Sequence, residues 1–207
     1  MIKALLLIFE PVAAWDRISR AKHGIAYIAI TYLIPMLLLT AFVEGYGLEH
    51  WGKSREIGPP RVYSRGEAII FEAAQTLLYV IVVCIGSKLI KSIGETFHGR
   101  HTYTQAFTSV AYGLGPFFLL HLFDGFKDVI PWITWAIGII LTAGVLYQGL
   151  PRIMEPDPSH AFGLYFMGSL LLVLTTGLAR FVTAWYLAGK FVGLESFITS
   201  LAKRIQF

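Results

Sequence analysis

Ionisable and polar residues inside long apolar stretches are the first candidates for chemistry in this 207-residue chain. Glu67, Glu72 and Gln75 stand at the start of one such stretch, and Glu72 and Gln75, three residues apart, share one face of a helix. Charge at membrane depth is costly and usually faces protein or water, so these side chains are candidates for an intramembrane polar or ligand site. Water at the membrane interface would also satisfy both carboxylates, and this alternative stays open.

Arg180 is the next candidate, because it follows nineteen uncharged residues of another apolar stretch. A long arginine side chain at such a position can extend to the lipid headgroups. The sharper hypothesis is an ion pair with Glu67 or Glu72, which would lie on the same side of the membrane. Both interpretations remain open.

Histidines add one further candidate, His121, three residues before Asp124 at the end of a third apolar stretch. The two side chains form either a proton-sensitive pair or a solvated helix end. His98 and His101 are also three apart, but no cysteine or third ligand stands near them. The sequence has no nucleophile elbow, phosphate-binding loop or paired-histidine zinc helix, so we predict no catalytic residue, no metal site and no cofactor.

The elements that must position these residues are membrane-spanning helices. The chain is 56% apolar and only 14% charged, its mean hydropathy is +0.63, and residues 24–43 form a run of twenty residues without charge. Such a run matches the thickness of a bilayer, and no stretch alternates as a barrel strand would. We predict a single all-α domain over residues 1–207, a polytopic helical bundle with five transmembrane helices. The predicted spans are 24–43, with Pro35 inside it, 67–90, 103–123, 129–150, which ends at Pro151, and 161–189.

Residues 1–22 precede the first span and resemble a signal peptide only superficially. Their apolar part has six residues before Glu10 and Pro11 interrupt it, which is too short for a signal sequence. Pro11 favours the start of a short helix through Trp15, and aromatic and basic side chains suit the headgroup layer. We therefore predict a retained interfacial helix, with Trp15 as an interface anchor.

Two short motifs resemble those of the Yip1 family. Glu10-Pro11-Val12-Ala13-Ala14-Trp15, just before the first span, is similar to the Pro-x-x-x-Trp segment of bacterial members, and Ala111-Tyr112-Gly113-Leu114-Gly115-Pro116 in the third span is similar to the family's Ala-Tyr-x-x-x-Pro pattern. The resemblance implies a helical integral membrane protein with a cytoplasmic N-terminus, and for the bacterial type it implies a fold and not an activity. Eukaryotic relatives engage Rab-type GTPases, but this chain departs from them because it has no long N-terminal domain.

The same motif has a physical reading in the third span. Pro116 lacks a backbone donor and Gly113 has no side chain, so the helix is expected to bend there or to let a neighbour approach closely. Tyr112 is then placed to hydrogen-bond to the freed backbone. Packing, a hinge and a ligand cleft all remain possible uses of the bend.

The charge pattern indicates partners and orientation. The net charge is +4, and the basic residues are scattered among loop ends, which favours contact with lipid headgroups and not with nucleic acid. Three basic residues near the first span precede it and two follow it, which favours a cytoplasmic N-terminus and an outside C-terminus, in a bacterial plasma membrane by the resemblance.

Two classes of function fit these features. The first is a non-enzymatic scaffold or interaction protein that binds lipids and other membrane proteins or itself, as an accessory subunit of a larger complex. The second is a small transporter, channel or lipid-handling protein that uses the Pro116 bend and the Glu67, Glu72 and Arg180 set.

Overall fold

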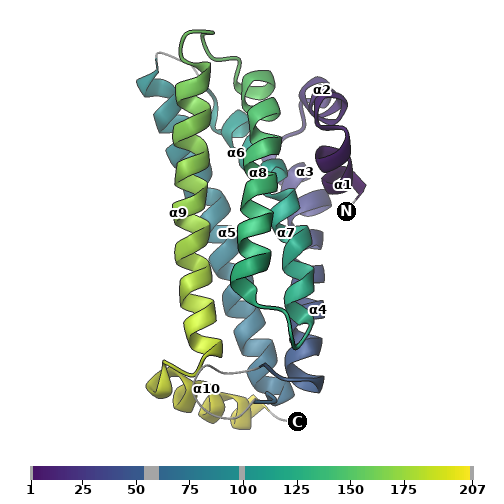
Figure 1. Ribbon diagram of the computed structural model, residues 1–207, viewed down its shortest axis with the longest axis vertical. Helices are drawn as coiled ribbons and strands as arrows, with labels where there is room; N and C mark the ends of the chain where they lie inside the picture. Colours follow the sequence, from purple (N-terminus) through teal and green to yellow (C-terminus); the bar gives the residue numbers. More distant parts are fainter. Residues whose placement is uncertain (1, 54–60, 98–100, 206–207) are drawn as a thin grey trace.

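A computed structural model describes residues 2–53, 61–97 and 101–205 of the chain (Figure 1). Five helical segments in these ranges are long and apolar enough to cross a membrane: Ile25–His50, Arg65–Thr96, Tyr103–Gly125, Pro131–Met154 and Ala161–Leu187. The structure is 84% helical and has no strand among its described residues. The predicted all-α membrane bundle is confirmed.

The first span continues beyond its predicted end at Val43. It consists of α3 (Ile25–Ile28), a π-helical turn η1 (Ala29–Leu33) and α4 (Ile34–His50). Pro35 is the second residue after the π-turn, so a wide turn accommodates the missing donor without breaking the helix. Because the helix runs on to His50, Glu44 lies inside the span and not in the following loop.

The second span, α5 (Arg65–Thr96), is longer than predicted at both ends. A capping box fixes its start: Glu67 N donates to Ser64 Oγ at 3.3 Å, and Ser64 N donates to Glu67 Oε2 at 2.9 Å. Glu67 is thus a capping residue at the mouth of the helix, while Glu72 lies more than a turn deeper.

The third span lies at the centre of the bundle and is broken where the Gly-Pro motif predicts. α6 (Tyr103–Gly113) ends at Leu114, α7 (Gly115–His121) begins with Pro116 in its first turn, and η2 (Leu122–Gly125) follows. This span is 83% buried over its most apolar window, whereas the fifth span is 22% buried. The third span therefore forms the core against which the other helices pack.

The last two spans are α8 (Pro131–Met154) and α9 (Ala161–Leu187). The prediction that Pro151 ends the fourth span is wrong, since α8 continues for one short turn. A proline there removes one backbone hydrogen bond, and Arg152 Nη1 donates to Gln148 O at 2.7 Å close by. Small residues serve internal packing: a Cβ on Gly138 would lie 3.1 Å from Phe117 Cα.

Three shorter helices complete the described chain: α1 (Ile2–Phe9), α2 (Pro11–Ala21) and α10 (Val192–Ile205). α1 packs on α7 and α2 packs on α8. Neither α1 nor α10 was predicted from the sequence. In Figure 1, α10 lies across the end of the bundle where α4 ends and α5 begins, and a Cβ on Gly66 would lie 3.1 Å from Ala202 Cβ.

Candidate functional site

A buried polar cluster joins the five spans near the α10 end of the bundle. Its members are at most 6% exposed: Glu44 on α4, Glu72 and Gln75 on α5, His121 on α7, Asp124 on η2, Thr134 on α8 and Arg180 on α9. Glu44 lies six residues before the end of α4 and Glu72 seven after the start of α5. At the helical rise per residue both lie about 10 Å inside the span, where charge needs partners.

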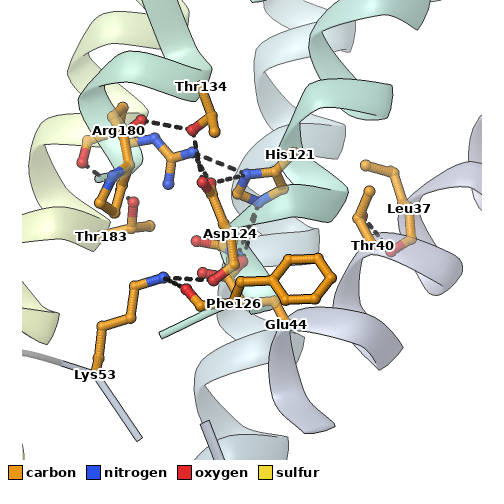
Figure 2. Close-up of polar contacts among 12 residues, drawn as sticks. Leu37, Thr40, Glu44, Lys53, His121, Asp124, Phe126, Thr134, Arg180 and Thr183 are labelled. Carbon is orange, nitrogen blue, oxygen red and sulfur yellow. Dashed lines mark hydrogen bonds and ion pairs between the residues drawn. The ribbon is translucent and has the colours of Figure 1, made fainter. Parts of the chain in front are cut away.

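Asp124 is the centre of the cluster (Figure 2). Its Oδ1 accepts from Thr134 Oγ1 at 2.5 Å, and its Oδ2 accepts from His121 Nδ1 at 2.6 Å and from Arg180 Nη2. The carboxylate therefore binds side chains from three helices at once. A buried carboxylate with this many donors is fully satisfied and holds the helices in one arrangement.

His121 lies between two carboxylates. Its Nε2 is 3.1 Å from Glu44 Oε2, while its Nδ1 contacts Asp124. Two hydrogen-bond donors also face the ring, because Arg180 Nη2 lies 2.9 Å from Nδ1 and Gln75 Nε2 lies 3.1 Å from Nε2. The predicted pair with Asp124 is present, and the alternative of a solvated helix end is wrong, because η2 folds Asp124 back into the bundle at 1% exposure.

Lys53 closes the cluster from the loop after α4. Its Nζ donates to the backbone carbonyls of Asp124 and, at 3.3 Å, of Phe126 (Figure 2). Burial removes water from the ammonium group and lowers the pKa of Lys53 below its usual value. The Lys53 side chain thus holds the backbone of the turn at Gly125.

Arg180 does not take either position that the sequence suggested. It is 0% exposed, so it does not extend to the headgroups, and its ion pair is with Asp124 and not with Glu67 or Glu72. Arg180 faces the interior of the bundle, whereas Phe181 and Trp185, on other faces of α9, are each 38% exposed. Arg180 Nε and Nη1 have no protein partner among the described residues.

Glu67 lies outside the buried polar cluster. Its Oε1 accepts from Arg61 Nη2 at 2.5 Å and from Thr199 Oγ1 at 2.6 Å. Together with the capping contacts to Ser64, these bonds tie α10 and the preceding loop to the start of α5. Glu67 is therefore a structural residue at the end of the bundle, not an intramembrane ligand.

Glu72 and Gln75 share a helix face, as predicted, and both belong to the cluster. Gln75 Nε2 donates to Glu44 Oε2 at 2.6 Å, but neither carboxylate oxygen of Glu72 has a hydrogen-bond partner. Glu72 also lines a groove of about 550 Å³ between α4 and α5. Among the predicted candidates it is the carboxylate that no described residue satisfies.

A metal ion has one possible set of ligands among the described residues: Glu44, His121 and Asp124 have ligand atoms within 4.8 Å of one another. Both ring nitrogens of His121 already face carboxylates, and Arg180 brings a positive charge to Asp124. These contacts leave this trio poorly suited to a metal. Of the other pair, His98 lies outside the described residues, and His101 packs against Gly94.

The two family motifs meet at the opposite end of the bundle. The rings of Trp15 and Tyr112 contact edge to face, with centroids 6.4 Å apart, and Trp15 Nε1 donates to Val145 O at 2.9 Å. Trp15 is 0% exposed, so the prediction of an interface anchor is wrong. Its ring fills the space above Gly149, where a Cβ would lie 2.3 Å from it, and it anchors α2 to α8.

Tyr112 does not bond to the backbone freed by Pro116. Its hydroxyl accepts from Lys3 Nζ at 3.3 Å, and its ring packs on Tyr32 with centroids 4.4 Å apart. Gly113 gives room to Leu146, since a Cβ would lie 2.5 Å from that side chain. Pro11 begins α2 and Pro116 lies in the first turn of α7, so the motif residues shape packing between helices.

Sequence reasoning missed Glu44, Thr134 and Lys53, and it left Asp124 outside the candidate site. Glu44 had a usable signal, because it is the first charge after the uncharged run and helices often extend past such a run. His121 and Asp124 at three-residue spacing were a second signal. Thr134 and Lys53 carry no pattern that distinguishes them.

Comparison with known proteins gives a family and no individual relative. No curated protein and no solved structure matches the chain. The Yip1 domain matches residues 5–192, which include all five spans and both motifs. The Yip1 family is not a known enzyme family. The match extends from α1 to the start of α10, and this integral membrane protein belongs to the Yip1 family.

Proposed function

We propose that the chain is a non-enzymatic scaffold or interaction protein of the membrane, an accessory subunit of a larger assembly. The observation that carries the proposal is the use of Asp124, whose carboxylate binds His121, Thr134 and Arg180 on three helices. Charge used in this way fixes one arrangement of helices. A fixed bundle suits a protein that presents a surface to others.

The surface that such a protein offers to a partner is the outer face of α9. Large apolar side chains stand there at four-residue spacing: Phe162, Phe166, Leu170, Leu174 and Leu178 are each at least 42% exposed. Helix surfaces of this kind pack against lipid or against another membrane helix. We infer that a helix of a partner membrane protein covers part of this face.

Isolation from the native membrane tests the proposal. A photo-crosslinking residue at Leu174 is expected to capture a stoichiometric partner that mass spectrometry identifies after mild-detergent extraction. The control is the same residue at Ile81, which is 42% exposed on α5. Lipid adducts alone at both positions, together with a protein that purifies by itself, would overturn the interaction role.

Orientation and location belong to the same proposal. Arg17, Arg20 and Lys22 precede the first span and favour a cytoplasmic N-terminus in a bacterial plasma membrane. With five spans, α10 and the buried polar cluster would lie on the outer side. A reporter fused after α10 that is active on the cytoplasmic side would reverse this assignment.

A second function is favoured by one observation, the unpartnered carboxylate of Glu72 beside a groove. A transporter, channel or lipid-handling protein keeps such groups for its substrate. Neutral replacement of Glu72 distinguishes the two roles. Loss of a flux with normal folding favours transport, and unchanged function favours the scaffold.

A further inference from the structure

Four buried oxygen atoms near the α10 end of the bundle have no hydrogen-bond donor among the described residues. They are Glu44 Oε1, both carboxylate oxygens of Glu72, and Gln75 Oε1. The three side chains are between 0% and 6% exposed. An unsatisfied buried acceptor is destabilising, and more so when it is charged, so four in one place require an explanation.

The three side chains face one another across the contact between α4 and α5. Gln75 Nε2 donates to Glu44 Oε2 at 2.6 Å, which places the free amide oxygen of Gln75 beside the Glu44 carboxylate. Glu72 precedes Gln75 by one turn on the same face of α5. A Cβ on Gly45, the residue after Glu44, would lie 3.1 Å from Glu72 Cγ, so both carboxyl groups approach the same short segment.

Glu72 has no ion pair among the described side chains. Asp124 pairs with Arg180, and His121 lies between Glu44 and Asp124. The ammonium group of Lys53 binds the backbone carbonyls of Asp124 and Phe126. The Glu72 carboxylate therefore has no cation in direct contact, a state that a low-dielectric interior strongly disfavours when the group is ionised.

The four free oxygen atoms indicate which kind of ligand would satisfy them. Carboxylate and amide oxygens without sulfur or free imidazole nitrogen are the ligands of hard cations. One carboxylate without an ion pair matches a monovalent ion better than a divalent one. Access also exists, because Glu72 lines a groove that includes Glu49, His50 and Arg65 nearer the helix ends.

We propose that Glu44, Glu72 and Gln75 bind a hard monovalent metal cation, Na⁺, between α4 and α5. The groove admits the ion from the α10 side, and the two carboxylates and the amide oxygen replace part of its water. The bound ion neutralises Glu72 and joins α4 to α5. This cation site is independent of whether a partner protein covers α9.

The test is thermal unfolding of the detergent-purified protein in NaCl, KCl or choline chloride at equal ionic strength. Sodium is expected to raise Tm in a saturable way, because it binds the folded state. Glu72→Gln is expected to abolish the sodium-dependent rise and, in choline, to be at least as stable as the wild type, since it removes a buried carboxylate that has no ion pair. Gln75→Leu is expected to weaken sodium binding about tenfold or more, as the loss of one polar ligand does.

The matched control is Glu49→Gln, which neutralises a carboxylate in the same groove outside the four-oxygen set. It is expected to keep the sodium-dependent rise in Tm. Equal Tm values for the wild type in sodium, potassium and choline would overturn the proposal, as would a rise that survives in Glu72→Gln. A response to Ca²⁺ or Mg²⁺ without one to Na⁺ would refute the monovalent assignment.

Discussion

Asp124→Asn removes the negative charge at the centre of the buried polar cluster and keeps the shape of the side chain. The amide can still accept from Thr134, but it loses two charge-assisted hydrogen bonds, from His121 Nδ1 and Arg180 Nη2. Each such bond contributes about 1.5–3 kcal/mol, and leaving one partner of a buried pair unpaired costs about 3–5 kcal/mol. We expect the free energy of unfolding to fall by about 3–5 kcal/mol.

Reversible unfolding in mixed micelles of SDS and a mild detergent measures this change. The control is Glu95→Gln, which breaks the exposed pair with Lys91 and is expected to change stability by less than about 1 kcal/mol. The double variant Asp124→Leu/Arg180→Met replaces the pair with apolar side chains and should recover much of the loss. A loss below about 1 kcal/mol in Asp124→Asn would refute the central role of this carboxylate.

Four further predictions concern other parts of the bundle. The charge exchange Arg180→Glu/Glu72→Arg is expected not to restore the stability lost in Arg180→Glu, because Arg180 pairs with Asp124; restored stability would reinstate the Glu72 pair. Gly149→Leu is expected to displace α2, since a Cβ there would lie 2.3 Å from Trp15, and faster tryptic cleavage at Arg17 and Arg20 would report this. Gly144→Ala is the control, because a Cβ at that position would have nothing within 4 Å. Glu67→Ala removes the bond from Ser64 N in the capping box and the bonds from Arg61 and Thr199. It is expected to lower stability by about 1–2 kcal/mol and to speed tryptic cleavage at Lys203. Unchanged cleavage would show that Glu67 does not hold α10. Burial lowers the pKa of Lys53 in the folded protein, so between that lowered pKa and about 10.4 the folded state binds fewer protons than the unfolded state. The free energy of unfolding of the wild type, relative to that of Lys53→Met, should therefore rise with pH in this window. A difference between the two proteins that is constant with pH would contradict the shift.

The spans were predictable because the signal for them is long and additive. Twenty uncharged residues before Glu44, or nineteen before Arg180, determine a membrane helix whatever its neighbours are. The break near Pro116 was predictable for a local reason, the missing backbone donor. The predicted end of the first span was wrong because a charged residue was taken to mark the boundary of the helix. Glu44 instead lies inside α4, where side chains from other helices bind it.

The buried polar cluster was only half predictable for a related reason. Glu72, Gln75, His121 and Arg180 stand out by their residue types, but which of them meet depends on how the helices rotate about their axes. A rotation of 100° separates one residue from the next, so Arg180 reaches Asp124 and not Glu72 through a difference that no spacing in the sequence records. The burial of Trp15 was not predictable for the same reason, since Gly149, against which it packs, lies 134 positions away.

The contacts of α1 and α2 have a consequence for the order of events during synthesis. Trp15 Nε1 binds the carbonyl of Val145, 130 residues later, and Lys3 binds Tyr112, 109 residues later. At about 5–20 residues per second, roughly 6 to 26 seconds separate the appearance of Trp15 from that of its partner. During that interval the amphipathic N-terminal segment can contact only the lipid surface and the earlier spans, and it packs on α8 after that helix has been inserted.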